Sequence, residues 1–205
     1  MQLRLTLKSL VLLVLLAWPC AELFGQAKAW GLGLEVGLTR FWGGSEPVAP
    51  NEAPGLKPYR PTSVGLRVDR KLGRSRVGLG VQYAASAIGQ DGPELAILLK
   101  GAMTWLQTTP EFAYQLAKIG PVAELRAFAG PVIDLWLPSG DESRVRAGGR
   151  AGLEFLVPLG SSLAGLLRVH GGVTGSLFRD TEVPTEFQTK LMPNAGLALG
   201  LRLGL

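Results

Sequence analysis

Apolar and polar side chains alternate along most of the chain, from Trp30 to Leu205. The stretch from Trp30 to Trp42 shows this most clearly, because large apolar residues fall at nearly every second position and glycine, glutamate or threonine at most positions between them. A two-residue period is typical of β-strands with two different faces. Eight such segments follow one another, at residues 30–42, 64–72, 77–84, 106–116, 124–135, 145–157, 163–174 and 191–205. The pattern therefore predicts an all-β protein of eight strands.

The connections between the predicted strands differ in length. We expect long loops at residues 43–62 and 88–100, short ones at 73–75 and 117–120, and further connections at 138–143, 158–162 and 178–189. The apolar run from Leu95 to Lys100 lacks alternation, and we assign it to the second long loop. The first long loop is expected to be irregular, because it contains Pro47, Pro50, Pro54, Pro58 and Pro61.

Alternation alone also fits a soluble barrel of the lipocalin type, which has an apolar and a polar face as well. Three features favour a membrane barrel instead. The polar face combines glycine with arginine and glutamate, which suits a narrow lumen. Trp30 and Trp42 share the apolar face and, at ~3.3 Å per residue and a tilt of about 40°, project to opposite edges of an apolar band about 25 Å tall. Short turns at one end and longer loops at the other are typical of outer-membrane barrels.

These features predict an eight-stranded antiparallel up-and-down transmembrane β-barrel over residues 30–205. We expect this domain to lie in the outer membrane. An even number of strands would leave both of its termini in the periplasm.

The first 29 residues read differently from the rest of the chain. Arg4 and Lys8 precede an apolar stretch from Leu10 to Trp18, and small residues follow between Gly25 and Ala29. This order is typical of a secretory signal peptide, although an N-terminal membrane anchor shares some of its features. We assign residues 1–29 to a signal peptide that is cleaved between residues 25 and 29.

The single cysteine, Cys20, lies inside the predicted signal peptide. The mature chain would then contain no thiol and could cross an oxidising compartment without disulfide chemistry. A lipoprotein signal would place small residues before this cysteine, but Trp18 and Pro19 stand there. The formal net charge of +5 comes from basic residues scattered among acidic ones, so we expect no nucleic-acid partner.

Charged residues on the predicted inner face are expected to pair inside the barrel. One register of the hairpin across residues 138–143 places Asp134 opposite Arg146 and Arg126 opposite Glu154, and we expect both to form ion pairs. Arg168, one strand on, should also approach Glu154. The predicted network comprises Glu35, Glu124, Arg126, Asp134, Arg146, Arg150, Glu154, Arg168, His170 and Arg202. Outward aromatic residues assigned to the membrane interface are Trp30, Trp42, Tyr83 and Tyr114.

Three segments occur in an order that resembles a known family: Thr104-Trp105-Leu106-Gln107 with Pro110, then Ala129-Gly130-Pro131, and the ending Gly196–Leu205. The chain resembles the outer-membrane β-barrel domain family of porin-like and PorT-like small barrels. The resemblance covers nearly all of the mature chain and implies a fold rather than an activity, because its motifs are degenerate. Leu205 stands where many such barrels end in phenylalanine, which weakens the match to the usual assembly signal.

The chain offers little for catalysis or metal binding. Its only histidine, His170, falls on the inner face midway along a strand, whereas a base that acts on a lipid ester needs access at the outer rim. Gly172 also stands where a deacylase-like pattern would place serine. Glu111 is expected to join a buried ion pair, and no second histidine is available as a metal ligand. We therefore expect no catalytic residue, no cofactor and no metal.

Side chains fill the interior of an eight-stranded barrel, so a wide diffusion pore is not expected. The sequence predicts a non-enzymatic outer-membrane component with a structural, binding or assembly role carried by its extracellular loops. A porin-like passive channel is the alternative, and a lipid A modifying enzyme is the third hypothesis. We expect a monomer surrounded by outer-membrane lipid, with the loops available to a protein partner.

Overall fold

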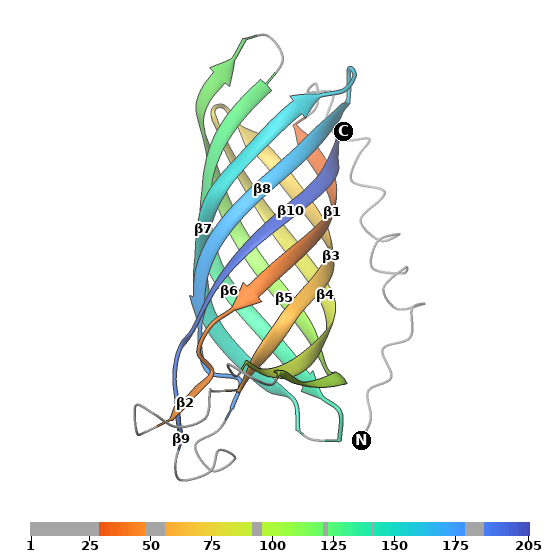
Figure 1. Ribbon diagram of the computed structural model, residues 1–205. Helices are drawn as coiled ribbons and strands as arrows, with labels where there is room; N and C mark the ends of the chain where they lie inside the picture. Colours follow the sequence, from red (N-terminus) through yellow and green to blue (C-terminus); the bar gives the residue numbers. More distant parts are fainter. Residues whose placement is uncertain (1–28, 48–55, 92–95, 121–122, 141, 179–186) are drawn as a thin grey trace.

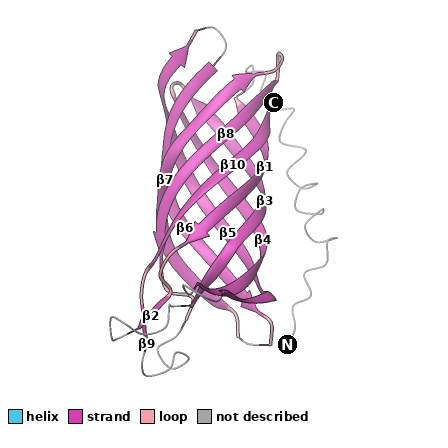
Figure 2. Ribbon diagram, viewed as in Figure 1, coloured by secondary structure: helices cyan, strands magenta, loops and turns pink. Residues whose placement is uncertain are grey.

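The computed structural model describes residues 29–47, 56–91, 96–120, 123–140, 142–178 and 187–205. In this part of the chain, Figure 2 shows strands joined by turns and loops. Eight strands close into one antiparallel barrel, which confirms the predicted fold class. They are β1 (Trp30–Phe41), β3 (Leu56–Leu72), β4 (Ser75–Asp91), β5 (Ala96–Ile119), β6 (Ala123–Pro138), β7 (Arg144–Pro158), β8 (Leu163–Thr174) and β10 (Met192–Gly204).

The predicted signal peptide falls almost entirely on residues 1–28, which lie outside the described residues, and it stays a prediction. None of the residues that the structure describes forms a helix long and apolar enough to cross a membrane.

Each barrel strand pairs with its neighbours in the chain, and β1 pairs with β10 to close the sheet (Figure 1). The closing ladder runs in a single register from Gly31 opposite Gly204 to Phe41 opposite Asn194. Closure removes the unpaired edges that an open sheet would present. The closed barrel therefore needs no partner strand, and it fixes the positions at which the connections at its two ends begin and end.

The two ends of the barrel differ (Figure 1). Trp30 and Leu205 lie at the end that also carries the tight turns at Gly73 and Gly120, and we call it the turn end. Gly73 and Gly120 have φ values of 64° and 61°, which glycine adopts without a steric penalty. The connection between β7 and β8 lies at the turn end as well, because Gly204 donates to the carbonyl of Ser162. The opposite end, the loop end, carries the remaining connections and a small sheet of β2 (Ser45–Pro47) and β9 (Phe187–Thr189).

The outer face of the barrel is apolar and the inner face is largely polar, as the alternation predicts. Along β1, the outward Leu34, Val36 and Leu38 are more than half exposed, whereas the inward Glu35 and Thr39 are buried. Outward residues with similar exposure occur on the other barrel strands, for example Leu66, Leu79, Phe112, Ile133, Leu153, Val169 and Leu199. Such an extensive exposed apolar face suits a lipid environment rather than water.

Two predicted loops are shorter than expected. β3 begins at Leu56, so Pro58 and Pro61 lie in a strand and not in an irregular loop. The ladder between β1 and β3 ends at Leu38 opposite Thr62. The residues of β3 before Thr62 therefore have no partner on the β1 side, and a proline there breaks no hydrogen bond of that ladder.

The assignment of Leu95 to Lys100 to a loop is wrong for Ala96–Lys100, which begins β5, while Leu95 lies outside the described residues. The backbone of this segment pairs with the end of β4, where Leu99 stands opposite Ile88. An irregularity between Ser86 and Ile88 separates this pairing from the regular ladder. That interruption hides the two-residue period that the sequence would otherwise show.

The predicted register of the hairpin between β6 and β7 is confirmed. Arg126 stands opposite Glu154, Gly130 opposite Arg150, and Asp134 opposite Arg146. A shift of one residue would have turned the charged face of one strand outward. The hairpin therefore aims the charged side chains of both strands into the lumen.

Candidate functional site

The middle of the lumen is built around the carboxylate of Glu111 on β5. Arg150 on β7 donates to it through Nη2 at 2.7 Å, and Arg168 on β8 donates through Nη2 at 2.9 Å. Arg67 on β3 donates to the same carboxylate. All four side chains are at least nine-tenths buried. One carboxylate thus joins three strands of the barrel wall to β5.

Two further carboxylates balance this cluster. Glu35 on β1 accepts from Nε of Arg67 at 2.7 Å and lies 3.5 Å from Nη1 of Arg168. Glu154 on β7 lies 3.4 Å from Nε of Arg168, which is the approach that the sequence predicts. Three carboxylates therefore face three guanidinium groups in the central lumen. Paired charges of this kind keep the interior neutral, so that burial does not leave an isolated charge.

A second charged cluster lies nearer the turn end. Arg202 on β10 donates to Asp69 on β3 at 2.6 and 2.9 Å. Arg76 on β4 lies 3.8 Å from Asp69 and 3.9 Å from Glu154, and so links the two clusters. Arg126 donates to Glu124, two residues before it on β6. The charged lining thus extends from the middle of the barrel to its turn end.

Small residues on the inner wall make room for these long side chains. A Cβ atom at Gly31 would overlap the guanidinium group of Arg202, and one at Gly196 would overlap the ring of His170. Both glycines lie on the inner face of the ladder between β1 and its neighbour β10. A larger residue at either position would therefore displace the neighbouring side chain, as expected for a narrow lumen.

The loop end of the lumen is closed by apolar side chains. Phe41, Trp105 and Trp136 pack together with ring centroids 5.4 to 5.6 Å apart, and each is at most 1% exposed. We call the cluster the aromatic plug, and its other buried members are Ala84, Met103, Leu177 and Met192. Offset and edge-to-face ring contacts of this kind add to the stability gained from burial. The plug separates the charged lumen from the loop end.

Asp134 connects the plug to the charged lumen. Its Oδ1 accepts hydrogen bonds from Nε1 of Trp105 at 2.8 Å and from Nε2 of Gln107 at 2.9 Å. Gln107 in turn accepts from Nη1 of Arg150 at 2.7 Å. A chain of hydrogen bonds therefore runs from the plug to the Glu111 cluster.

Two predicted ion pairs are wrong even though their register is right. Within the described part of the chain, Arg126 pairs with Glu124 instead of Glu154, and Glu154 pairs with Arg168 and Arg76. Arg146 is half-buried and donates to the carbonyl of Ser176, while Asp134 binds Trp105 and Gln107. Arginine side chains are long enough to reach past their direct cross-strand neighbours, so each can pair with any of several carboxylates in the lumen.

His170 lies where the sequence places it, on the inner face of β8, and is 8% exposed. Its ring packs against Gly196 on β10, so a side chain there would displace it. Among the described residues, no group of three or more His, Cys, Asp or Glu side chains is placed to hold a metal ion.

The four aromatic residues assigned to the membrane interface all point outward and are 39 to 54% exposed. Trp30 and Tyr114 lie at the turn end, where Arg70 and Arg74 place their guanidinium groups 5.7 and 5.4 Å from the ring centres. Trp42 lies at the loop end, 5.2 Å from Arg40. The fourth residue, Tyr83, lies along β4. Their position relative to a membrane stays a prediction.

Sequence reasoning omitted several residues from the network. Arg67, Asp69 and Arg76 belong to it, although the alternation of β3 and β4 was sufficient to place their side chains inside. Glu111 was expected in a buried ion pair, but its central position was not. The aromatic plug was missed because its members are apolar residues at inward positions, where the pattern predicts polar ones.

No protein-family model matches the chain, and no curated protein matches it by sequence. Among solved structures it is similar to Neisserial surface protein A, at 9% identity and a TM-score of 0.55, over 87% of this chain and 99% of that one.

It is also similar to the N-terminal β-barrel domain of Pseudomonas aeruginosa OprF, at 12% identity and a TM-score of 0.45 over 87% of this chain and all of that one. A major outer membrane protein from Thermus thermophilus gives 13% identity and a TM-score of 0.45 over 86% and 100%. At such low identities the similarity extends to the fold alone, and the evidence for it is the match to Neisserial surface protein A. The chain has the fold of a small outer-membrane β-barrel.

Proposed function

We propose that the protein is a non-enzymatic outer-membrane barrel with a sealed lumen, which acts as a structural, binding or assembly component through its loop end. In this proposal the turn end and both termini of the barrel domain face the periplasm. The loop end, with β2 and β9, faces the outside of the cell.

The packed lumen is the observation that carries the proposal. The aromatic plug fills the loop end, and salt-bridged side chains from β1, β3, β5, β7 and β8 meet behind it. A barrel of eight strands has little interior beyond what such side chains occupy. This filling argues against a porin-like passive channel. The packed lumen also supports a structural role for His170, because this residue is buried inside the barrel, away from the rim where a lipid would bind.

The sealed lumen leads to a prediction about conductance. Purified barrel inserted into a planar bilayer should show no discrete current steps, because water and ions find no continuous path through the plug and the charged clusters. A porin inserted under the same conditions provides the positive control. Reproducible steps of one size from the barrel would show that the lumen conducts and would favour the channel alternative.

The proposed orientation can be tested with single cysteines, because the mature chain is expected to contain none. Ser139 lies at the loop end and Ser161 in a turn-end connection, and both are exposed. We expect a membrane-impermeant maleimide to label Ser139→Cys in intact cells and Ser161→Cys only after lysis. The opposite labelling would reverse the orientation.

The non-enzymatic assignment is tested separately by mass spectrometry of lipid A from cells with and without the protein. The two lipid A spectra should be identical.

A further inference from the structure

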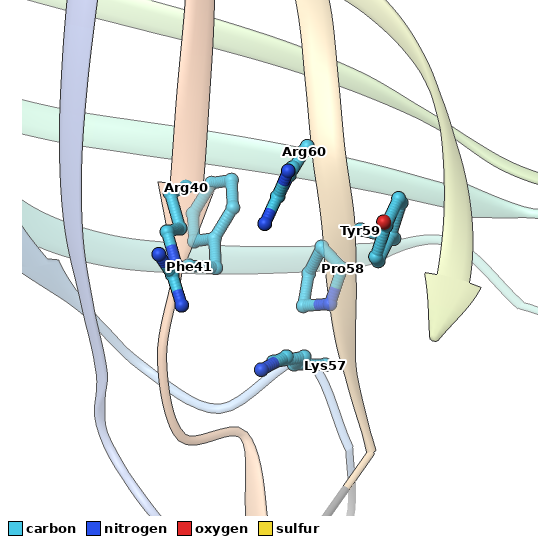
Figure 3. Close-up of a pocket in the computed structure, with 6 residues that line it drawn as sticks. All are labelled: Arg40, Phe41, Lys57, Pro58, Tyr59 and Arg60. Carbon is cyan, nitrogen blue, oxygen red and sulfur yellow. The ribbon is translucent and has the colours of Figure 1, made fainter. Parts of the chain in front are cut away.

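A small cleft opens at the loop end between the ends of β1 and β3 (Figure 3). The two strands are paired only as far as Leu38 opposite Thr62, and the end of β1 and the beginning of β3 are unpaired with each other beyond that point. The cleft is shallow and is lined by Arg40, Phe41, Lys57, Pro58, Tyr59 and Arg60. Three of these six described residues are cationic and none is acidic. The described lining of the cleft is therefore positively charged.

The backbone of β3 is shaped to bring Arg60 to this cleft. Arg60 and Pro61 together stand opposite the single residue Ser86 of β4, which makes a β-bulge. Bulges are common at the rims of barrels, where they redirect a side chain. Arg60 has a φ of 33°, a left-handed conformation that is costly for a residue with a side chain. Strain of this kind is most often retained at functional positions.

Aromatic rings support two of the three cations. The guanidinium group of Arg40 lies 5.2 Å from the ring centre of Trp42, and that of Arg60 lies 5.5 Å from the ring centre of Tyr59. The ring of Tyr59 packs over Gly89 on β4, where a Cβ atom would press against it. The rings hold both guanidinium groups near the cleft while leaving their N–H groups available to a ligand.

The cations share a face with the apolar band. Arg40 is exposed and points outward, on the same side of β1 as Leu38 and Trp42, which are 56% and 39% exposed. A ligand bound here would have its acidic group at the rim and would find an apolar surface directly beneath it. Tryptophan and tyrosine rings are typical of the headgroup level of a membrane. Guanidinium groups bind phosphate through paired, charge-assisted hydrogen bonds, and a lysine adds a compact charge.

We infer that this cleft binds the phosphate group of a membrane lipid, with Arg40, Lys57 and Arg60 around the phosphate and the acyl chains along the outer face of β1 and β3. The inference rests on the proposed membrane function and adds a lipid site to it. A phosphate ion free in solution has the same charge but gains nothing from the apolar surface below the cleft.

The chain offers a matched control for this site. Arg70 and Arg74 also place their guanidinium groups over aromatic rings on the outside of the barrel, but at the turn end. Each of the variants Arg40→Gln with Arg60→Gln, and Arg70→Gln with Arg74→Gln, removes two positive charges and two ring contacts. The second also removes the hydrogen bond from Arg74 to the carbonyl of Gln115. Retained heat-dependent gel mobility checks that both variants fold.

Native mass spectrometry of the folded barrel in detergent, titrated with dioleoyl phosphatidic acid, measures the affinity of the site. We expect Arg40→Gln with Arg60→Gln to weaken binding roughly 10- to 30-fold, because each basic side chain contributes about a factor of five to the binding of an anionic lipid. The turn-end variant should lose less than about threefold. Phosphatidylcholine, whose phosphate carries a choline group, should bind more weakly to the unchanged protein.

Equal losses in the two variants would show a general effect of charge and would overturn the site, as would no loss in either. Displacement of the lipid by an equal concentration of inorganic phosphate would identify a site for the free anion and overturn the lipid assignment. Binding in detergent does not depend on the direction of insertion or on conductance. A negative result therefore leaves the proposed function standing, and a conducting or inverted barrel leaves the lipid result interpretable.

Discussion

Replacement of Glu111 by glutamine is expected to lower the free energy of unfolding of the inserted barrel by roughly 3 to 5 kcal/mol. Glu111 is 6% exposed, and its carboxylate binds Arg67, Arg150 and Arg168. Glutamine preserves the shape of the side chain but removes the negative charge, which leaves an excess of buried positive charge in the central lumen. Urea unfolding in lipid vesicles, followed by the gel mobility of the folded form, measures the loss.

Two further variants show whether the loss comes from buried charge. Glu142→Gln makes the same change at an exposed position of the loop end and should cost less than about 1 kcal/mol. Glu111→Gln combined with Arg150→Gln removes one charge of each sign and should cost less than the sum of the single variants. If Glu111→Gln costs no more than Glu142→Gln, water reaches the network and the lumen is not sealed.

The two-residue period was sufficient to predict the barrel and the inward or outward side of most residues. The reason is that one shift in a strand turns its whole apolar face into the lumen, so the pattern constrains register as well as secondary structure. Asp134 opposite Arg146 and Arg126 opposite Glu154 follow from this constraint. The positions at which β3 and β5 begin do not follow from it, because a bulge in β3 and an irregular pairing between β4 and β5 interrupt the period there.

Charge partners inside the lumen could not be predicted from register alone. Arginine side chains span several strands, and Glu111 gathers partners from β3, β7 and β8 although it pairs directly with Gly78 on β4. Which of these contacts forms depends on the curvature of the closed sheet. The sequence shows the charges and their side of the wall, but not the distances across the lumen.

Inward glycines also look equivalent in the sequence and are not equivalent in space. A Cβ atom at Gly200 would overlap the carbonyl oxygen of Leu34, whereas one at Gly33 would meet nothing nearer than 3.5 Å. The difference lies in how closely the neighbouring strand approaches each glycine, which alternation does not encode. The aromatic plug illustrates the same limit: Trp105 and Trp136 are direct neighbours across β5 and β6, but Phe41 on β1 reaches them only when the sheet has closed.

Replacement of Leu199 by arginine should test the apolar outer face directly. Leu199 is 60% exposed and lies in the middle of β10, between Val36 on β1 and Leu167 on β8, which also face outward. An arginine on the lipid face costs roughly 2 to 4 kcal/mol near the middle of the bilayer, because its charge loses water without gaining a partner. We expect a loss of this size in urea unfolding from vesicles.

The same substitution at Leu191 provides the control. Leu191 is 66% exposed and directly precedes β10 at the loop end, so an arginine there can reach headgroups and water. Its cost should fall to between 0 and about 1 kcal/mol. This comparison keeps residue type, added charge and outward direction constant, and changes only depth along the barrel. Equal costs at the two positions would mean that the outer face of β10 is not crossed by a membrane, because water offers no reason for an exposed arginine to be worse in the middle of a strand than at its end.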